Sequence, residues 1–229
     1  MSWLAATLAV LFFVILIVMH RRHRAQVKAE RGALFENVLT LFEHYRVEQD
    51  DVDFPVLGGR YRGFEIKLEP LVDHVAVRKL PSLWLLATVK AELPQKSALD
   101  FLARPLNTEF YSPSSHMEHR LPTPAGYPAG LRVSADGLEG LPSPSVIANQ
   151  ATLFDDTKVK ELVMTPRGVR LVYQLAEAER PYYLVLRQAE FGPHLRLDPA
   201  LARRLLDRAI AIIEELRRDP PPADRTRPS

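Results

Sequence analysis

The chain has 229 residues, of which 47% are hydrophobic and 25% charged, a balance typical of globular proteins that bury a core. Its formal net charge of +2 is too small to indicate a nucleic-acid partner, and we expect none. It contains no cysteine, which excludes disulfides, thiolate zinc sites, iron–sulfur clusters and cysteine nucleophiles.

An apolar run extends from Trp3 to Met19, and Thr7 is its only polar residue. As a helix rising about 1.5 Å per residue, the run covers about 25 Å, close to the minimum for crossing a bilayer core. A cleaved signal peptide would carry basic residues before the apolar run, whereas here they follow it. A helix in a soluble core would normally show a polar face. The run therefore predicts a single transmembrane helix, in a layout typical of bacterial inner-membrane proteins.

Basic residues gather on one flank of this run, namely Arg21, Arg22, Arg24, Lys28 and Arg31. By the positive-inside rule, the N-terminus is expected outside the plasma (inner) membrane and the C-terminal domain in the cytoplasm. Trp3, Arg21, Arg22 and Arg24 are the predicted membrane-interface residues, since the basic side chains would meet anionic headgroups. The lipid bilayer is thus the first predicted partner.

The sequence divides into an anchor with its basic flank (1–23), a membrane-proximal amphipathic helix (24–49), an α+β domain (50–218) and a disordered tail (219–229). Apolar residues recur at helical spacing from Leu34 to Tyr45, so the helix is expected to continue to about Val47, with Gly32 as a hinge. Its apolar stripe is wider than a coiled-coil seam, which favours packing on the domain. The tail is rich in Pro, Arg and Asp.

Alternating apolar and polar residues predict strands in the domain, separated by turn residues. The predicted strands are 54–61, 64–69, 75–79, 83–90, 99–103, 131–133, 161–164, 169–175 and 182–187. A short helix is expected at 145–153, and Asp198 as N-cap with Pro199 at the first position predicts a last amphipathic helix. The fold class is therefore α+β: one transmembrane helix, then one mixed domain with an antiparallel sheet and flanking helices. Arg-Gly pairs at 62–63 and 167–168 leave an internal duplication open.

Residues 105–145 form a proline-rich excursion, and loops of this length are either functional or loose. The excursion contains a cluster of residue types that can bind a metal, His116-Met117-Glu118-His119. A metal site needs preorganised ligands from more than one element, so a solvated loop is the favoured interpretation.

Two other clusters have equally ordinary interpretations. Asp73 and His74 lie between predicted strands and could form an acid/base pair, but adjacent residues on a strand point to opposite faces, which disfavours the pair. Asp155-Asp156 is expected to be a cap or turn. Exposed basic residues on the sheet and last helix (Arg78, Lys79, Arg170, Arg187, Arg203 and Arg204) are expected to be solvated, although an anion site is an alternative. Since no nucleotide, hydrolase, kinase or zinc-helix motif is present, we assign no catalytic, cofactor-binding or metal-binding residue and expect no cofactor.

These observations favour a non-catalytic, membrane-anchored interaction or accessory protein of a membrane complex, with another membrane protein as its partner. The alternative is a membrane-tethered ligand-sensing or enzymatic domain, whose pocket forms where the 105–145 excursion closes over the sheet. A third hypothesis is homo-oligomerisation through the span and the helix at 34–45.

Overall fold

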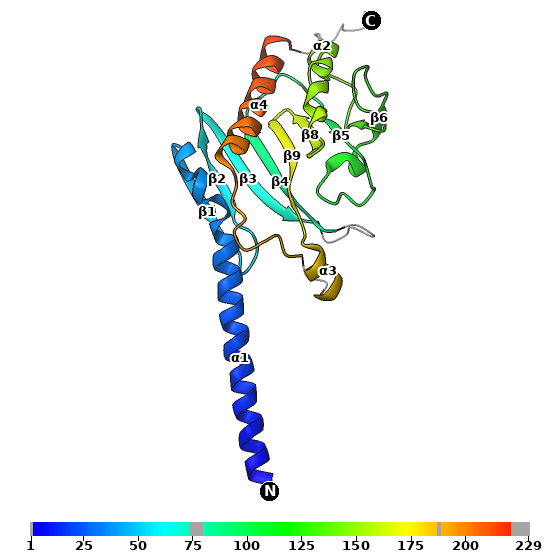
Figure 1. Ribbon diagram of the computed structural model, residues 1–229. Coiled ribbons are helices and arrows are strands. Elements are labelled where there is room, and N and C mark those ends of the chain that lie inside the picture. The colour runs from blue at the N-terminus through cyan, green and yellow to red at the C-terminus, as the bar shows by residue number, and fades with distance from the viewer. Residues whose placement is uncertain (1, 74–79, 187–188, 221–229) are drawn as a thin grey trace, which may run out of the picture.

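The computed structural model describes residues 2–73, 80–186 and 189–220. A long helix, α1 (Ser2–Gly32), projects from one end of a domain built on an open antiparallel sheet with flanking helices (Figure 1). The predicted α+β fold class is confirmed. The apolar side chains of α1 from Trp3 to Met19 are exposed, and α1 is the one helix in the described ranges that is long and apolar enough to cross a membrane.

Nine strands form the sheet in the described part of the chain, in the order β1-β2-β3-β4-β9-β8-β5-β7-β6. They are β1 (His44–Glu48), β2 (Val56–Tyr61), β3 (Phe64–Val72), β4 (Ser82–Lys90), β5 (Leu99–Leu102), β6 (His119–Leu121), β7 (Arg132–Ala135), β8 (Val159–Thr165) and β9 (Gly168–Glu177). The other helices are η1 (Ala33–Leu41), η2 (Pro113–His116) and η3 (Ala151–Asp155), all 3₁₀, with α2 (Pro144–Ala148), α3 (Arg180–Leu186) and α4 (Pro199–Arg218).

The main hydrophobic core lies on one face of the sheet. Leu68, Leu85 and Leu171 are fully buried on neighbouring strands, beneath α4 and η1. Helix α4 begins as predicted: the Asp198 side chain accepts a hydrogen bond of 3.0 Å from the amide of Ala200, with Pro199 in the first turn. Burial of its apolar stripe, rather than helix propensity alone, holds α4 in place.

The opposite face has a different composition. Trp84, Leu86 and Val172 form a small apolar cluster there, with Leu71 and Tyr111 packed against it. Tyr111 belongs to the excursion, so the first part of 105–145 covers this second face, while α4 covers the first. The sheet thus has an apolar face that stabilises the domain and a more polar face covered by irregular chain.

The region after the anchor differs from the prediction. The α-helix ends at Gly32, η1 follows, and β1 occupies residues that we expected to be helical up to Val47. Strand β1 pairs along β2 from His44↔Arg60 to Glu48↔Val56. This pairing satisfies the free edge of β2, a tertiary gain that outweighs the helical spacing of the sequence.

Most predicted strands are confirmed, but one prediction is wrong, and one observed strand besides β1 was not predicted. Residues 182–187 were predicted as a strand, but Tyr182 and Tyr183 lie in helix α3. Strand β6 was not predicted at all, because the prolines around it obscure any alternation. The proposed strand 75–79 lies outside the described residues, as does the predicted tail from residue 221. Asp219 is ordered, since its carboxylate accepts hydrogen bonds from the hydroxyls of Ser143 and Ser145.

Two tight hairpins set the register, and they turn differently. In the first, Arg62 and Gly63 form the loop, with φ of 49° and 81°, as a type I′ turn requires. In the second, the loop is Pro166-Arg167, and Gly168 is already the first residue of β9. The two Arg-Gly pairs therefore occupy different positions in their hairpins, and the duplication stays a hypothesis.

We predict that Gly168→Ala lowers the free energy of unfolding by about 2–3 kcal/mol. Gly168 has φ of +143°, and a Cβ there would clash with the carbonyl oxygen of Val89 on β4. The matched control is Gly58→Ala, because a Cβ at Gly58 meets no atom within 4 Å. Thermal unfolding of the full chain in detergent micelles measures both; equal melting temperatures for the two variants would contradict the prediction.

Candidate functional site

Two acidic side chains are buried side by side on the second face of the sheet. Asp100 on β5 and Glu161 on β8 both have 0% exposure. Leu102 is paired with Glu161 and Asp100 with Val163, so the two acids are diagonal neighbours on the same face. We call this pair the carboxyl pair.

A β-bulge in β8 brings further charge to this place. The pairing of β8 with β9 shifts between Val159 and Glu161, which leaves Lys160 as the extra residue. Such a bulge re-aims side chains, and here Lys160 lies with its Nζ 6.0 Å from the ring centroid of Trp84 on the second face. The side chains of the adjacent residues Lys160 and Glu161 therefore lie on the same face of the sheet, which a regular strand does not allow.

Lys160 ties the excursion to the sheet. Its Nζ donates to Glu109 Oε1 at 2.8 Å and to the Arg104 carbonyl oxygen at 2.8 Å, and the two charged side chains are 4% and 5% exposed. Burial raises the pKa of Glu109, but hydrogen bonds from Lys160 and the Leu106 amide outweigh burial, so its pKa ends below the usual value. A buried pair of this kind costs several kcal/mol if one partner is removed, on the order of 3–5 kcal/mol.

Hydroxyl groups of the excursion and β7 surround the carboxyl pair. Ser114 and Ser134 lie with their Oγ atoms 3.1 Å apart, and Arg120 donates to both. A cavity of about 370 Å³ opens beside them. Its lining includes Asn107, Glu109, Ser112, Ser114, Arg120 and Arg132. This cavity lies where the excursion covers the second face, and whether it takes a ligand stays a prediction.

The carboxyl pair holds its protons more tightly than carboxyl groups in water. Burial raises the pKa of Asp100 well above its usual range, and the negative charge of Glu161 raises it further. Burial also raises the pKa of Glu161. Two acids buried side by side in a low-dielectric site resist ionising together, so the pair keeps a proton to higher pH than an exposed carboxyl group does. Chemically, such a pair is a proton reservoir near neutral pH.

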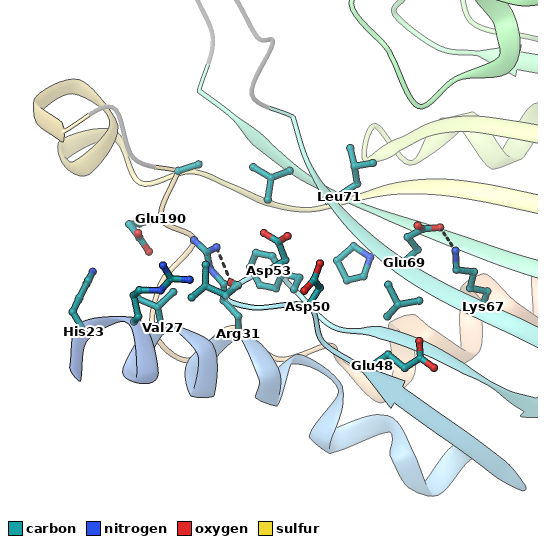
Figure 2. Close-up of a pocket in the computed structure, with 17 residues that line it drawn as sticks. His23, Val27, Arg31, Glu48, Asp50, Asp53, Lys67, Glu69, Leu71 and Glu190 are labelled. Atoms are coloured by element: carbon teal, nitrogen blue, oxygen red, sulfur yellow. Dashed lines mark hydrogen bonds and ion pairs between the residues drawn. The ribbon is translucent and has the colours of Figure 1, made fainter. Parts of the chain in front are cut away.

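A second hollow lies where the domain meets α1. This juxtamembrane groove has a volume of about 850 Å³ and is bounded by α1, residues 48–56, the end of β3 and residues 189–190 (Figure 2). Its lining carries five carboxylates, namely Glu48, Asp50, Asp53, Glu69 and Glu190, against the three cationic groups of Arg24, Arg31 and Lys67. Figure 2 shows Asp50 and Asp53 between α1 and β3, and Lys67 bound to Glu69.

The carboxylates of the groove are only partly neutralised. Lys67 Nζ lies 2.7 Å from Glu69 Oε2, and Arg24 pairs with Asp51 next to the groove. Within the described part of the chain, Asp50, Asp53 and Glu190 form no ion pair. The groove therefore presents an excess of negative charge directly beside the basic residues of α1.

Helix α1 is fixed to the domain at this groove by contacts on successive turns. Arg31 Nη1 donates to the Val52 carbonyl oxygen at 3.1 Å, and its guanidinium carbon lies 5.2 Å from the ring centroid of Phe54. Gln49 Nε2 donates to the Lys28 carbonyl oxygen at 2.9 Å. The helix is thus braced against residues 49–54 instead of joined through a flexible linker.

The residues that the sequence analysis singled out lie at separate places in the structure. Trp3, Arg21 and Arg22 are exposed along α1, and Arg24 lines the groove; their contact with a membrane interface stays a prediction. Asp155 ends η3 and Asp156 follows as its C-cap, so the predicted cap is confirmed.

The histidine clusters are not gathered into a site. His116 ends η2 and His119 begins β6, and no three His, Asp or Glu side chains are grouped to hold a metal in the ranges described. Asp73 is buried, whereas His74 lies outside the described residues.

Sequence reasoning missed the carboxyl pair. Its signal was present: Asp100 interrupts the apolar run 99–103, and Lys160-Glu161 precedes the apolar run 162–164. An acid inside a predicted buried strand needs a partner or a proton, which is a reason to search for a second acid on a neighbouring strand. Comparison with protein-family models, curated proteins and solved structures gives no match for this chain.

We predict that stability falls as pH rises through the neutral range. An unfolded carboxyl group loses its proton near pH 4–5, whereas the carboxyl pair keeps a proton to higher pH, so the native state binds more protons in this window. The free energy of unfolding should drop by roughly 1–3 kcal/mol between about pH 5 and pH 8. Thermal unfolding of the full chain in micelles across this range measures the slope.

The variant that tests the cause is Asp100→Asn with Glu161→Gln, which has no proton to lose and should flatten the slope. Glu65→Gln on β3 is the matched control, because its side chain is 73% exposed and its substitution should leave the slope unchanged. An equally steep fall in the double variant would show that the carboxyl pair is not the source.

Proposed function

We propose that the protein is a single-pass, membrane-anchored, non-catalytic accessory protein that binds an integral membrane partner through its juxtamembrane groove. The observation that carries this proposal is the groove itself: an acidic hollow next to the end of an exposed apolar helix long enough to span a bilayer. The orientation follows from the basic flank, with the domain on the cytoplasmic side of the plasma (inner) membrane.

The direct connection of anchor and domain supports a positioning role. From Met19 to Gly32 the helix rises about 20 Å, and its last turns are fixed to residues 49–54. A flexible tether would let the domain search a large volume, whereas a braced helix holds the groove at one height above the bilayer. A fixed height suits a partner that is itself embedded in the membrane.

The charge of the groove indicates what part of a partner it would bind. Cytoplasmic flanks of transmembrane helices are rich in Lys and Arg. Such a flank would lie at the height of the groove, and Asp50, Asp53 and Glu190 offer it carboxylates that are not already paired with described residues. Val27, Phe54 and Leu71 add apolar surface to the same lining. The predicted partner chemistry is therefore a basic, partly apolar juxtamembrane segment.

A ligand-sensing domain is the second candidate, and the carboxyl pair is the observation that favours it. Buried acids with raised pKa beside a cavity are a common feature of functional sites. In this alternative, a small molecule binds under the excursion and alters the ion pair between Glu109 and Lys160, which joins the excursion to the sheet.

We predict that reversing one ion pair in the groove, Lys67→Glu with Glu69→Lys, abolishes recovery of the membrane partner. In-cell crosslinking and affinity purification followed by mass spectrometry measures recovery. Both exchanged side chains face the groove, so the change alters its charge pattern while preserving net charge.

The matched control exchanges Lys90→Glu with Glu65→Lys, an exposed pair joining β4 and β3 outside this groove, and should keep the partner. A chain starting at Arg24 should lose it. No stoichiometric membrane partner for the unaltered chain would refute the proposal and favour the ligand-sensing candidate, whereas recovery of a second copy alone would identify a homo-oligomer.

A further inference from the structure

Helix α3 projects from the domain with apolar side chains in solvent. Tyr182, Leu184 and Val185 are 49%, 61% and 79% exposed. The helix has seven residues, and isolated helices of this length are not stable in water. Exposed apolar groups on a short, weakly supported helix indicate a surface that is covered in the working protein.

The position of α3 identifies what covers it. The segment after α3 returns to the base of α1: Ala189 and Glu190 line the juxtamembrane groove together with His23 and Arg24. Phe191 contacts Phe54, with ring centroids 6.0 Å apart. Figure 1 shows α3 at the end of the domain from which α1 projects, away from α4. Helix α3 is thus on the side of the domain that faces the end of the apolar span.

The composition of α3 fits the bilayer interface. Tyrosine is enriched at membrane–water boundaries, where its ring contacts acyl chains and its hydroxyl stays hydrated. Leu184 and Val185 supply apolar surface beside Tyr182, and Arg180 at the start of the helix is exposed, where it can contact lipid phosphate. A soluble protein partner would explain the apolar groups equally, but not their location beside the end of an exposed membrane-spanning segment.

We propose that α3 inserts into the headgroup region of the bilayer that α1 spans, as a second membrane contact. This inference rests on the proposed function, because it requires α1 to be in the membrane. One span leaves the domain free to rotate about the helix axis. A second contact removes that freedom and fixes the direction in which the juxtamembrane groove faces along the membrane surface.

The natural absence of cysteine allows single-site spin labelling of the full chain in nanodiscs of zwitterionic and anionic phospholipid. Labels at Val185→Cys, at Phe12→Cys in the span and at Leu138→Cys in the excursion all replace exposed side chains. Collision with oxygen reports lipid contact, and collision with a water-soluble nickel chelate reports water contact. The Val185 label should show an oxygen-to-nickel ratio several-fold above that of Leu138 and approaching that of Phe12.

A charged variant tests whether apolar contact holds α3 in place. With the label at Tyr182→Cys, adding Leu184→Asp should return the ratio to the Leu138 value. A Val185 ratio equal to that of Leu138, with Phe12 in lipid, would overturn this proposal and leave the anchor intact; water contact at Phe12 would overturn the anchor itself. Strong dipolar coupling between Val185 labels in discs holding two chains would assign the surface to a second copy and also overturn it.

Discussion

The pairing of β4 with β9 is the constraint on which the rest of the domain depends. Strands β1 to β4 form one meander and β5 to β9 form the other part, and among the described residues the sheet connects them through this ladder alone. A shift by one residue would exchange the two faces of every strand beyond it. If β9 and the strands beyond it shifted, Leu171 would leave the core under α4 and Glu161 would enter it, while Leu85 on β4 would stay. One register therefore separates an apolar face from a polar one.

The two faces of the sheet contribute differently to the stability of the domain. Under α4, the apolar face supplies the hydrophobic free energy of folding. On the other face, the bulge at Lys160, the Glu109 ion pair and the carboxyl pair all carry desolvation costs that an apolar core would avoid. The covering excursion is held by these polar contacts and by apolar ones, since Tyr111 packs on Trp84 and Tyr127 stacks on Phe101.

Much of this fold could be predicted from local patterns. The apolar run, the Arg62-Gly63 turn, the largely apolar strand β4 and the Asp198 cap each carry a signal within a few residues, and all four appear as expected. What failed depended on tertiary context. Strand β1 forms by pairing with the free edge of β2. Helix α3 contains the segment Tyr-Tyr-Leu-Val, whose residue types favour a strand when they are considered alone. The carboxyl pair unites residues far apart in sequence, and a bulge that no periodicity reveals completes its surroundings.

The end of the domain near the anchor combines three features that are independent in sequence: the basic flank of α1, the acidic groove and the exposed apolar helix α3. Each alone has an ordinary explanation as a stop-transfer signal, a solvated loop or a surface irregularity. Their arrangement is not explained in this way, because Arg24 and Glu190 line one groove, and α3 lies at the same end of the domain (Figure 1). A domain that only needed tethering would not require its helix to be braced by Arg31 and Gln49. Bracing matters when the direction of a binding surface must be fixed relative to the bilayer, and the proposed binding of a membrane-embedded partner has this requirement.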